Sequence, residues 1–250
     1  MSVLPGAEPL RRSGGPVGVL LCHGFTGTPQ SMRPWAEHLA DAGLSVSLPL
    51  LPGHGTTWQL MNRTGFADWY AEVERAFEEL REHCPTVFAM GLSMGATLAL
   101  RLAELRGDQV AGLVVVNASL ATERRDARLL PLLSRVLPSL PGIASDIAKP
   151  GVSELAYDRI PLRAANSLQQ AWPVVRRELP RITCPVLAYR SATDHVVTPL
   201  SGRELLKGCV AAEERVLRDS YHVATLDHDA PAIFAGSLDF VRAHAPAAAG

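Results

Sequence analysis

The stretch that decides the fold is Ala89-Met90-Gly91-Leu92-Ser93-Met94-Gly95-Ala96, where a strand pattern over residues 86–90 gives way to a helical pattern. It contains Gly-x-Ser-x-Gly, in which glycines flank a serine in a turn too tight for side chains on either side. Such a turn exposes the Ser93 hydroxyl above the end of a sheet, beside the unpaired N–H groups that begin the next helix. The pattern predicts a nucleophile elbow, and the alternatives are an ordinary serine in a Gly-rich strand-to-helix turn or a phosphate-cradling loop.

Short aliphatic runs alternate with helix-length amphipathic segments along most of the chain. This alternation predicts an α/β fold with a mainly parallel sheet of about six to eight strands flanked by helices. The expected strands are 17–22, 45–48, 86–90, 110–116, 186–191 and 214–217. The expected helices are 29–42, 66–83, 94–106, 199–207 and 230–244.

One segment, 118–185, is far longer than the dozen or so residues that a crossover needs. It is rich in leucine and contains several prolines, among them Pro131, Pro138 and Pro141. We therefore expect a small helical cap, about 119–165, inserted after the strand at 110–117. The whole chain, 1–250, is expected to form a single α/β domain that includes this insertion.

The composition excludes several classes of protein. Apolar residues make up 47% and charged residues 20% of the chain, which predicts a buried core rather than disorder. A net charge of −1 without a basic run argues against a nucleic-acid partner. The longest apolar runs are strand-sized, so no integral membrane segment is expected. The four cysteines lack metal-site spacing and are expected to be reduced thiols, which favours a cytoplasmic location without a metal or cofactor.

A serine hydroxyl needs a base and an acid that orients the base, and both are expected downstream of Ser93. Asp194 follows the strand at 186–191, and His222 follows the last strand, so both lie at carboxyl ends of parallel strands. The order Ser93, Asp194, His222 is that of α/β-hydrolase triads. A helix cap is the alternative for Asp194, while His195 and His228 are the poorer candidates for the base.

The reaction also needs two N–H donors for a developing oxyanion. One is expected from Met94, the residue after the nucleophile. The other is expected from Phe25, in the loop His23-Gly24-Phe25-Thr26-Gly27 that follows the first predicted strand. His54, in a turn after the second strand, is interpreted as structural support for that loop.

These motifs resemble those of the α/β-hydrolase superfamily, in particular its bacterial monoacylglycerol lipase and carboxylesterase group. The resemblance covers nearly the whole chain and is weakest at residues 121–140. It rests on the following stretches: His23-Gly24-Phe25-Thr26-Gly27-Thr28-Pro29, Pro52-Gly53-His54-Gly55, Gly91-Leu92-Ser93-Met94-Gly95, Glu154-Leu155-Ala156-Tyr157 and Ser220-Tyr221-His222-Val223-Ala224-Thr225-Leu226-Asp227.

The resemblance implies a triad of Ser93, Asp194 and His222, and a lid with an acyl tunnel. It also implies that Ile143 and Glu154 contact the glycerol portion of a substrate. Ordinary packing is the alternative for Ile143, and a solvated residue at the start of a short helix is the alternative for Glu154. The family normally has Gly-Gly where this chain has Gly95-Ala96, a change expected to leave the oxyanion donors unaffected.

The sequence thus predicts a cofactor-independent serine hydrolase that cleaves carboxylic esters, either monoacylglycerols or short- to medium-chain acyl esters. A thioesterase or acyltransferase on the same triad is the alternative, and a non-catalytic binding protein of the same fold is a more distant one. The Leu-rich cap predicts transient contact with a lipid surface. Acyl chain length and oligomeric state are left open.

Overall fold

A computed structural model describes residues 3–143 and 145–246. Its centre is a seven-stranded sheet in the order β1-β3-β2-β4-β5-β8-β9, in which only β1 runs antiparallel to its neighbour. The strands of this sheet are β1 Leu10–Arg12, β2 Val17–Cys22, β3 Ser45–Leu48, β4 Thr86–Leu92, β5 Gly112–Val116, β8 Val186–Ser191 and β9 Ala212–Leu217. A separate two-stranded antiparallel sheet pairs β6 Ser139–Pro141 with β7 Arg159–Pro161.

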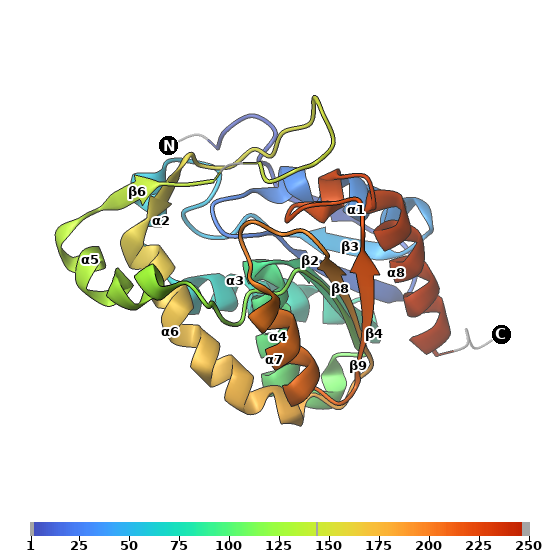
Figure 1. Cartoon of the computed structure of the whole chain (residues 1–250). Coiled ribbons are helices and arrows are strands. Elements are labelled where there is room, and N and C mark those ends of the chain that lie inside the picture. The colour runs from blue at the N-terminus through green and yellow to red at the C-terminus, as the bar shows by residue number, and fades with distance from the viewer. Residues whose placement is uncertain (1–2, 144, 247–250) are drawn as a thin grey trace.

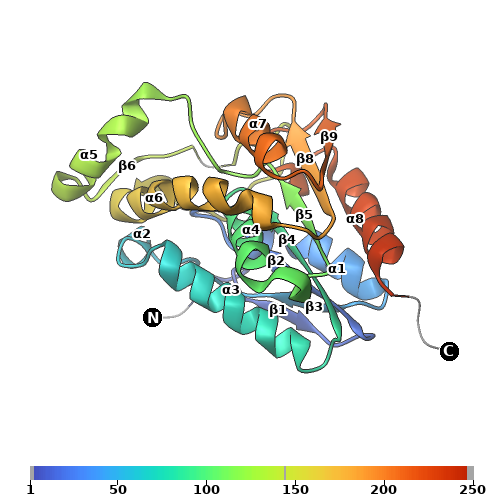
Figure 2. The ribbon, with the colours of Figure 1, turned by 90° about the horizontal axis from the view of Figure 1, so that it is seen from below.

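Helices cover both faces of the central sheet (Figures 1 and 2). Helices α3, α4, α6 and α7 lie on one face, and α1 and α8 lie on the other. The helices are α1 Arg33–Asp41, α2 Trp58–Met61, α3 Phe66–Arg81, α4 Met94–Arg106, α5 Leu130–Val136, α6 Leu162–Glu178, α7 Pro199–Gly208 and α8 Ala230–His244. None of those in the described residues is long and apolar enough to span a bilayer.

The alternation of side chains along the strands produces two hydrophobic cores. In β4, Val87 and Ala89 face the core under α3, α4 and α6, whereas Phe88 and Met90 face the core under α1 and α8. Trp69 of α3 and Trp35 of α1 are fully buried, one in each core. The parallel sheet is therefore enclosed on both faces, as the continuous apolar runs of its strands require.

The segment 119–165, which we call the cap segment, contains α5 and the β6–β7 pair. Figure 2 shows α5 and β6 projecting beyond the edge of the central sheet, next to the amino-terminal part of α6. Apolar side chains of this part stay exposed, including Leu132 at 62% and Val136 at 71%.

The architecture confirms the predicted mainly parallel sheet and most of its strands. The bounds of β2, β3 and β8 match the prediction, while β4 extends to Leu92 and β9 begins at Ala212. Several elements were not predicted, among them β1, α2, α6 and the β6–β7 pair, which lies inside the segment expected to be a helical cap. Strand β1 has only three residues, and helix α6 contains Pro173, which hides it in a sequence search for unbroken helices.

The register places the carboxyl ends of the parallel strands at one edge of the sheet. Cys22 of β2 pairs with Gly91 of β4, and Leu92 pairs with Val116 of β5. Ser191 of β8 pairs with Leu217 of β9. The loops after β2, β4, β5, β8 and β9 therefore share one edge, where ligands of open α/β sheets bind.

Candidate active site

Ser93 stands alone between β4 and α4 in a backbone conformation that side chains rarely adopt, with φ 56° and ψ −116°. Its N–H donates to the Val116 carbonyl of the neighbouring strand at 2.9 Å. A Cβ atom at Gly91 would overlap the backbone of Gly95, and one at Gly95 would overlap the carbonyl of Cys22. Only glycine fits at either position, so the sequence builds the sharp turn that presents the Ser93 side chain at the sheet edge.

His222 and Asp194 meet at the same edge from two different loops. The Nδ1 atom of His222 lies 2.8 Å from Oδ2 of Asp194. The other carboxylate oxygen, Oδ1, accepts the N–H groups of Val196 at 2.8 Å and Val197 at 2.7 Å. The carboxylate is thereby fixed, and it holds the imidazole with a proton on Nδ1 and with Nε2 as the free acceptor.

The end of β5 brings the serine and the histidine to neighbouring places. Val116 accepts the N–H of Ser93, while the next residue, Asn117, donates its side-chain amide to the carbonyl of His222 at 2.8 Å. Both Ser93 and His222 are 7% exposed. The structure thus gathers the predicted nucleophile and base around a single strand end.

Charge stabilises the imidazolium form of His222. Burial alone disfavours that form, but the carboxylates of Asp194, Glu154 and Asp146 outweigh it and raise the pKa of His222. Burial likewise opposes ionisation of Asp194, yet His222 and two backbone N–H groups hold the pKa of this carboxyl below its ordinary value. The pair therefore consists of an ionised acid and a base that is readily protonated.

The loop after β2 passes directly beside the nucleophile. A Cβ atom at Gly24 would lie 3.6 Å from the Cβ of Ser93, which places the following residue, Phe25, at the site. The Phe25 ring packs edge-on against Trp69 with 5.9 Å between the ring centroids. Met94 is the first residue of α4, so its N–H has no partner within the helix.

Two buried histidines support this loop. His23 donates from Nδ1 to the carbonyl of Gly24 at 3.0 Å and accepts the N–H of Leu51 on Nε2 at 3.2 Å. Burial lowers the pKa of His23 to about 4, so the ring is neutral and keeps this single tautomer. The His54 ring packs edge-on against His23 with 4.9 Å between the centroids. This contact agrees with the interpretation of His54 as structural support.

Glu154 reaches the other side of the same loop. A Cβ atom at Gly27 would lie 2.5 Å from Oε1 of Glu154, so the carboxylate packs directly on the glycine backbone. Burial raises the pKa of Glu154, an effect opposed by His222 and by the Ser31 hydroxyl. No helix begins at Glu154, which removes the alternative of a solvated residue favoured by a helix dipole.

Ile143 lies after β6 and is 56% exposed, so it is not an ordinary core residue. Among the residues that the structure describes, there is no cluster of three or more histidine, cysteine or acidic side chains arranged to hold a metal ion.

Comparison with known families decides where the chain belongs. A family model described as serine aminopeptidase, S33, matches residues 17–229. This range contains Ser93, Asp194 and His222. The chain belongs to this α/β-hydrolase family.

Relatives of this S33 hydrolase include proteins named as ester hydrolases. A thermostable monoacylglycerol lipase of Bacillus sp. (strain H-257) is 46% identical over 247 residues, which cover 97% of each chain. A carboxylesterase of Bacillus subtilis (strain 168) is 25% identical over 94% of this chain and 96% of its own. One solved structure matches with a TM-score of 0.94, and its description names LipS and LipT, two metagenome-derived lipolytic enzymes. It is 44% identical and covers 97% of this chain and 100% of its own.

Two buried polar residues of the S33 hydrolase site were missed by sequence reasoning. Asn117 links β5 to β8 by accepting the N–H of Ser191 at 2.7 Å, besides holding the His222 carbonyl. Asn117 could have been predicted from the sequence, because it directly follows an apolar strand. Asp146 of the cap segment also reaches the His222 loop, and no local pattern marks it in the sequence.

Proposed function

We propose that this S33 hydrolase cleaves monoacylglycerols, with Ser93 as nucleophile, His222 as general base and Asp194 as the acid that orients it. The observation that carries the proposal is the partly buried hydrogen bond between His222 and Asp194 beside the strained Ser93 turn. A carboxylate-fixed imidazole next to a serine at a helix start is the arrangement that acyl transfer requires.

In the proposed reaction, Oγ of Ser93 attacks the ester carbonyl carbon while Nε2 of His222 takes the hydroxyl proton. The N–H groups of Phe25 and Met94 stabilise the resulting oxyanion. The intermediate collapses as the ester C–O bond breaks and the departing alkoxide takes the proton from His222. Water then attacks the acyl-enzyme by the same route and releases the fatty acid and free Ser93.

Glu154 supports a polyol as the leaving group. Its carboxylate lies at the oxyanion loop and can accept hydrogen bonds from glycerol hydroxyls that a simple alkyl ester lacks. The relative with 46% identity is named as a monoacylglycerol lipase, which favours the same substrate. Ile143 stays a proposed contact of the acyl glycerol from the cap segment, since its exposed side chain is available for it.

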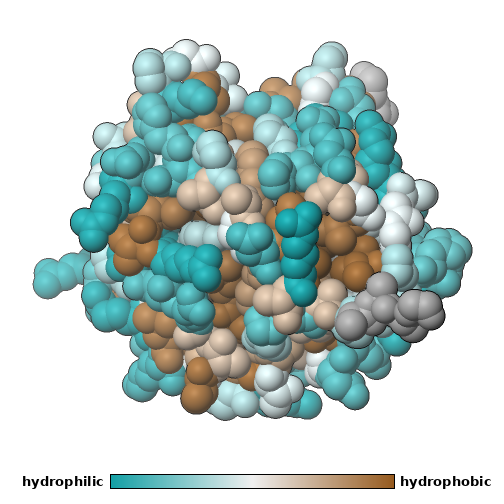
Figure 3. Space-filling model, turned by 90° about the vertical axis from the view of Figure 1, so that its right-hand side faces the viewer, coloured by the Kyte–Doolittle hydropathy of each residue, from teal (hydrophilic) through white to brown (hydrophobic). Residues whose placement is uncertain are grey.

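The proposal includes transient contact between the cap segment and a lipid surface. Five apolar side chains of α5 and its flanks are between 38% and 71% exposed, and they are Leu129, Leu132, Val136, Leu137 and Leu140. The face of the molecule near α8, on the side away from α5, differs, because hydrophilic side chains there separate the apolar ones into small groups (Figure 3). Large exposed apolar patches are typical of sites that meet lipid or protein.

The expected cytoplasmic location belongs to the same proposal. All four cysteines, Cys22, Cys84, Cys184 and Cys209, are buried and none forms a disulfide. Unpaired thiols are typical of reducing compartments.

The proposal is tested with Ser93→Ala and Glu154→Gln variants of the purified protein. We expect Ser93→Ala to keep the fold and to lose about 10⁴-fold or more in kcat on a p-nitrophenyl ester, together with labelling by a fluorophosphonate. Turnover retained by a folded Ser93→Ala protein would contradict the catalytic assignment.

The substrate class is tested by comparing a monoacylglycerol, the methyl ester of the same acid and its acyl thioester. Glu154→Gln keeps the size of the side chain but removes its charge, and it is expected to lower kcat/KM for the monoacylglycerol by about tenfold more than for the methyl ester. An equal loss on both would disprove the glycerol contact. Preference of the wild type for the thioester would favour the thioesterase alternative.

A further inference from the structure

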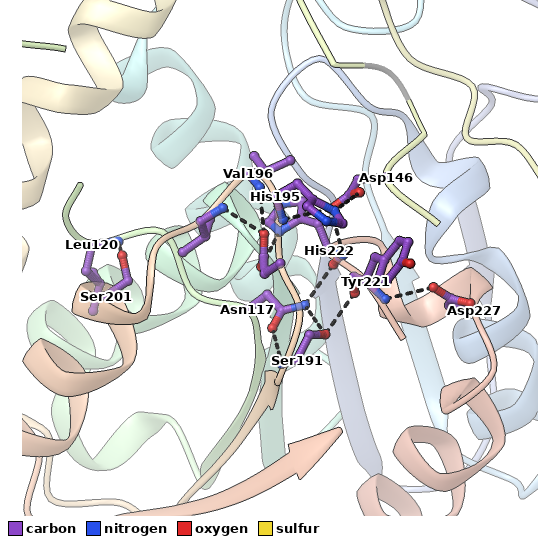
Figure 4. A network of polar contacts seen from close by, with 12 residues as sticks. Asn117, Leu120, Asp146, Ser191, His195, Val196, Ser201, Tyr221, His222 and Asp227 are labelled. Atoms are coloured by element: carbon purple, nitrogen blue, oxygen red, sulfur yellow. Dashed lines mark hydrogen bonds and ion pairs between the residues drawn. The ribbon is translucent and has the colours of Figure 1, made fainter. Parts of the chain in front are cut away.

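A carboxylate from the cap segment reaches the loops that carry the proposed acid and base. Asp146 is 8% exposed, and its Oδ2 accepts the backbone N–H of His195 at 3.1 Å and of His222 at 3.2 Å. Its Oδ1 lies 2.7 Å from Nδ1 of His195. Figure 4 shows Asp146 beside His195 and His222, at the end of this network opposite to Asn117 and Ser191. A single side chain thus connects two loops that are far apart in sequence.

The two backbone N–H groups that the Asp146 carboxylate accepts belong to residues that decide the geometry of the proposed triad. His195 directly follows Asp194, and His222 is the proposed base. The backbone of His222 is consequently held at both ends, with its carbonyl on Asn117 of β5 and its N–H on Asp146. A small displacement of either loop would misalign the hydrogen bond between Asp194 and His222.

Fastening the cap segment does not by itself require this carboxylate. Asp227, from the same loop as His222, accepts the N–H groups of Ala148 at 2.7 Å and Lys149 at 2.9 Å. The cap segment is therefore held to the His222 loop immediately after Asp146. Asp146 differs from Asp227 because it contacts the His222 backbone itself and adjoins Asp194 through His195.

We propose that Asp146 is a positioning residue, which aligns the proposed base His222 with Asp194 from the cap segment and adds a negative charge beside the imidazolium that forms during the reaction. This inference rests on the proposed function. It links the segment that would receive the substrate to the geometry of the catalytic base, so that movement of the cap segment at Asp146 changes the alignment of the base.

The charge of Asp146 distinguishes positioning from simple tethering. Burial lowers the pKa of His222, and the negative charges of Asp194, Glu154 and Asp146 raise it. Removal of one of them lowers that pKa, whereas loss of a neutral tether does not. The acid limb of the pH profile of kcat/KM reports the pKa of the base in the free enzyme. It therefore provides a readout that a purely structural role leaves unchanged.

The experiment measures kcat, KM and the pH profile on a soluble p-nitrophenyl ester for Asp146→Asn, Asp146→Ala, Asp227→Asn and His195→Ala. We expect Asp146→Ala to lower kcat by about 10- to 100-fold with little change in KM, as for other misplacements of catalytic groups by about 1 Å. Asp146→Asn, which has nearly the same shape, should move the midpoint of the acid limb to lower pH. Asp227→Asn should lower the Tm without moving that midpoint.

His195→Ala leaves Asp146 and both backbone contacts in place, so the midpoint of its acid limb should equal that of the wild type. An Asp146→Asn enzyme with the kcat and the midpoint of the wild type would overturn the inference. The same conclusion follows if Asp227→Asn or His195→Ala reproduces the whole effect of Asp146→Asn. Fluorophosphonate labelling of the wild type separates the two proposals, because an unlabelled Ser93 would refute the triad itself rather than the role of Asp146.

Discussion

Ser93 illustrates how single residues are held in unfavourable states at this site. Its positive φ costs on the order of 1–3 kcal/mol, and the turn persists because buried structure surrounds it. The N–H of Ser93 is bonded to β5, and Asn117, which has φ 47°, holds the loop of His222 nearby. Strain at the nucleophile is thus balanced by hydrogen bonds from the adjacent strand end.

A second residue in an unfavourable state, Glu104 of α4, lies away from the site. Its side chain is fully buried beside Arg101, with Nη1 of Arg101 2.9 Å from Oε2 and with no partner for Oε1. Burial raises the pKa of Glu104 to about 7, although Arg101 opposes the shift. The folded protein therefore retains a proton that the unfolded chain releases near pH 4.5.

We predict that Glu104 makes the protein less stable at alkaline pH. Its pKa is raised on folding, so its contribution is full below about pH 4.5 and is lost as the pH rises through about 7, about 3 kcal/mol in all. Between pH 6 and pH 9 the free energy of unfolding of the wild type should fall more than that of Glu104→Gln. Urea unfolding measures both, with the exposed Glu123→Gln as control. Parallel curves for wild type and Glu104→Gln would contradict this origin.

At the scale of elements, the contact between α4 and β2 determines where the nucleophile stands. Helix α4 begins directly after Ser93, and its first turn lies so close to the end of β2 that Gly95 has no room for a side chain. Ala96, the next residue, is fully buried but carries its methyl group without such a conflict. The departure of this chain from the Gly-Gly pattern therefore falls on the position that tolerates it.

We predict losses of stability of different size for substitutions at these two neighbouring positions. Gly95→Ala should lower the free energy of unfolding by about 3 kcal/mol, because the new Cβ must push apart α4 and the β2 backbone. Ala96→Gly should lower it by only about 1 kcal/mol through helix propensity and leave kcat unchanged. Urea unfolding and ester hydrolysis measure these effects. A Gly95→Ala protein as stable as the wild type would show that the turn can relax.

The whole molecule divides into parts that are held differently. Residues 145–157 of the cap segment are bonded to the sheet-edge loops, since Gln30 accepts the N–H of Leu155 and the Tyr157 hydroxyl bonds to Gly53 and Thr56. Within this part, Ser145 accepts the N–H of Glu154. The part around α5 instead exposes its apolar side chains. The fixed part carries Asp146 and Glu154, whereas the exposed part is available to a lipid surface.

We predict that Leu132→Ser combined with Val136→Ser weakens binding to vesicles that contain monoacylglycerol by about tenfold, because less apolar area would enter the lipid. Hydrolysis of a soluble ester should be unchanged. Val210→Ser is the matched control, since Val210 is 96% exposed but lies outside the cap segment. Vesicle sedimentation measures binding. An equal loss for the control, or no loss for the double variant, would contradict lipid contact through α5.

By itself, the sequence determined the parts of this protein whose causes are local. Strand and helix periods, the glycines around Ser93, and the polar residues after strands 186–191 and 214–217 predicted the sheet, the elbow and the candidates Asp194 and His222. Helix α6 was not predicted, because Pro173 interrupts its pattern while packing against α4 sustains it. The sequence around Glu154 also does not show whether this residue begins a helix or packs against Gly27, as it does in the structure.

Only the tertiary structure decided which distant residues share the site. Asp146 and Asn117 hold the N–H and the carbonyl of His222, although each is more than 70 residues away from it in sequence. Such partners are chosen by the register of the strands and by the path of the cap segment, and neither leaves a periodic trace in the chain. The hydrogen bond of His222 to Asp194 is likewise a result of where two loops meet. Residue type supplies the chemistry, and three-dimensional packing sets its alignment.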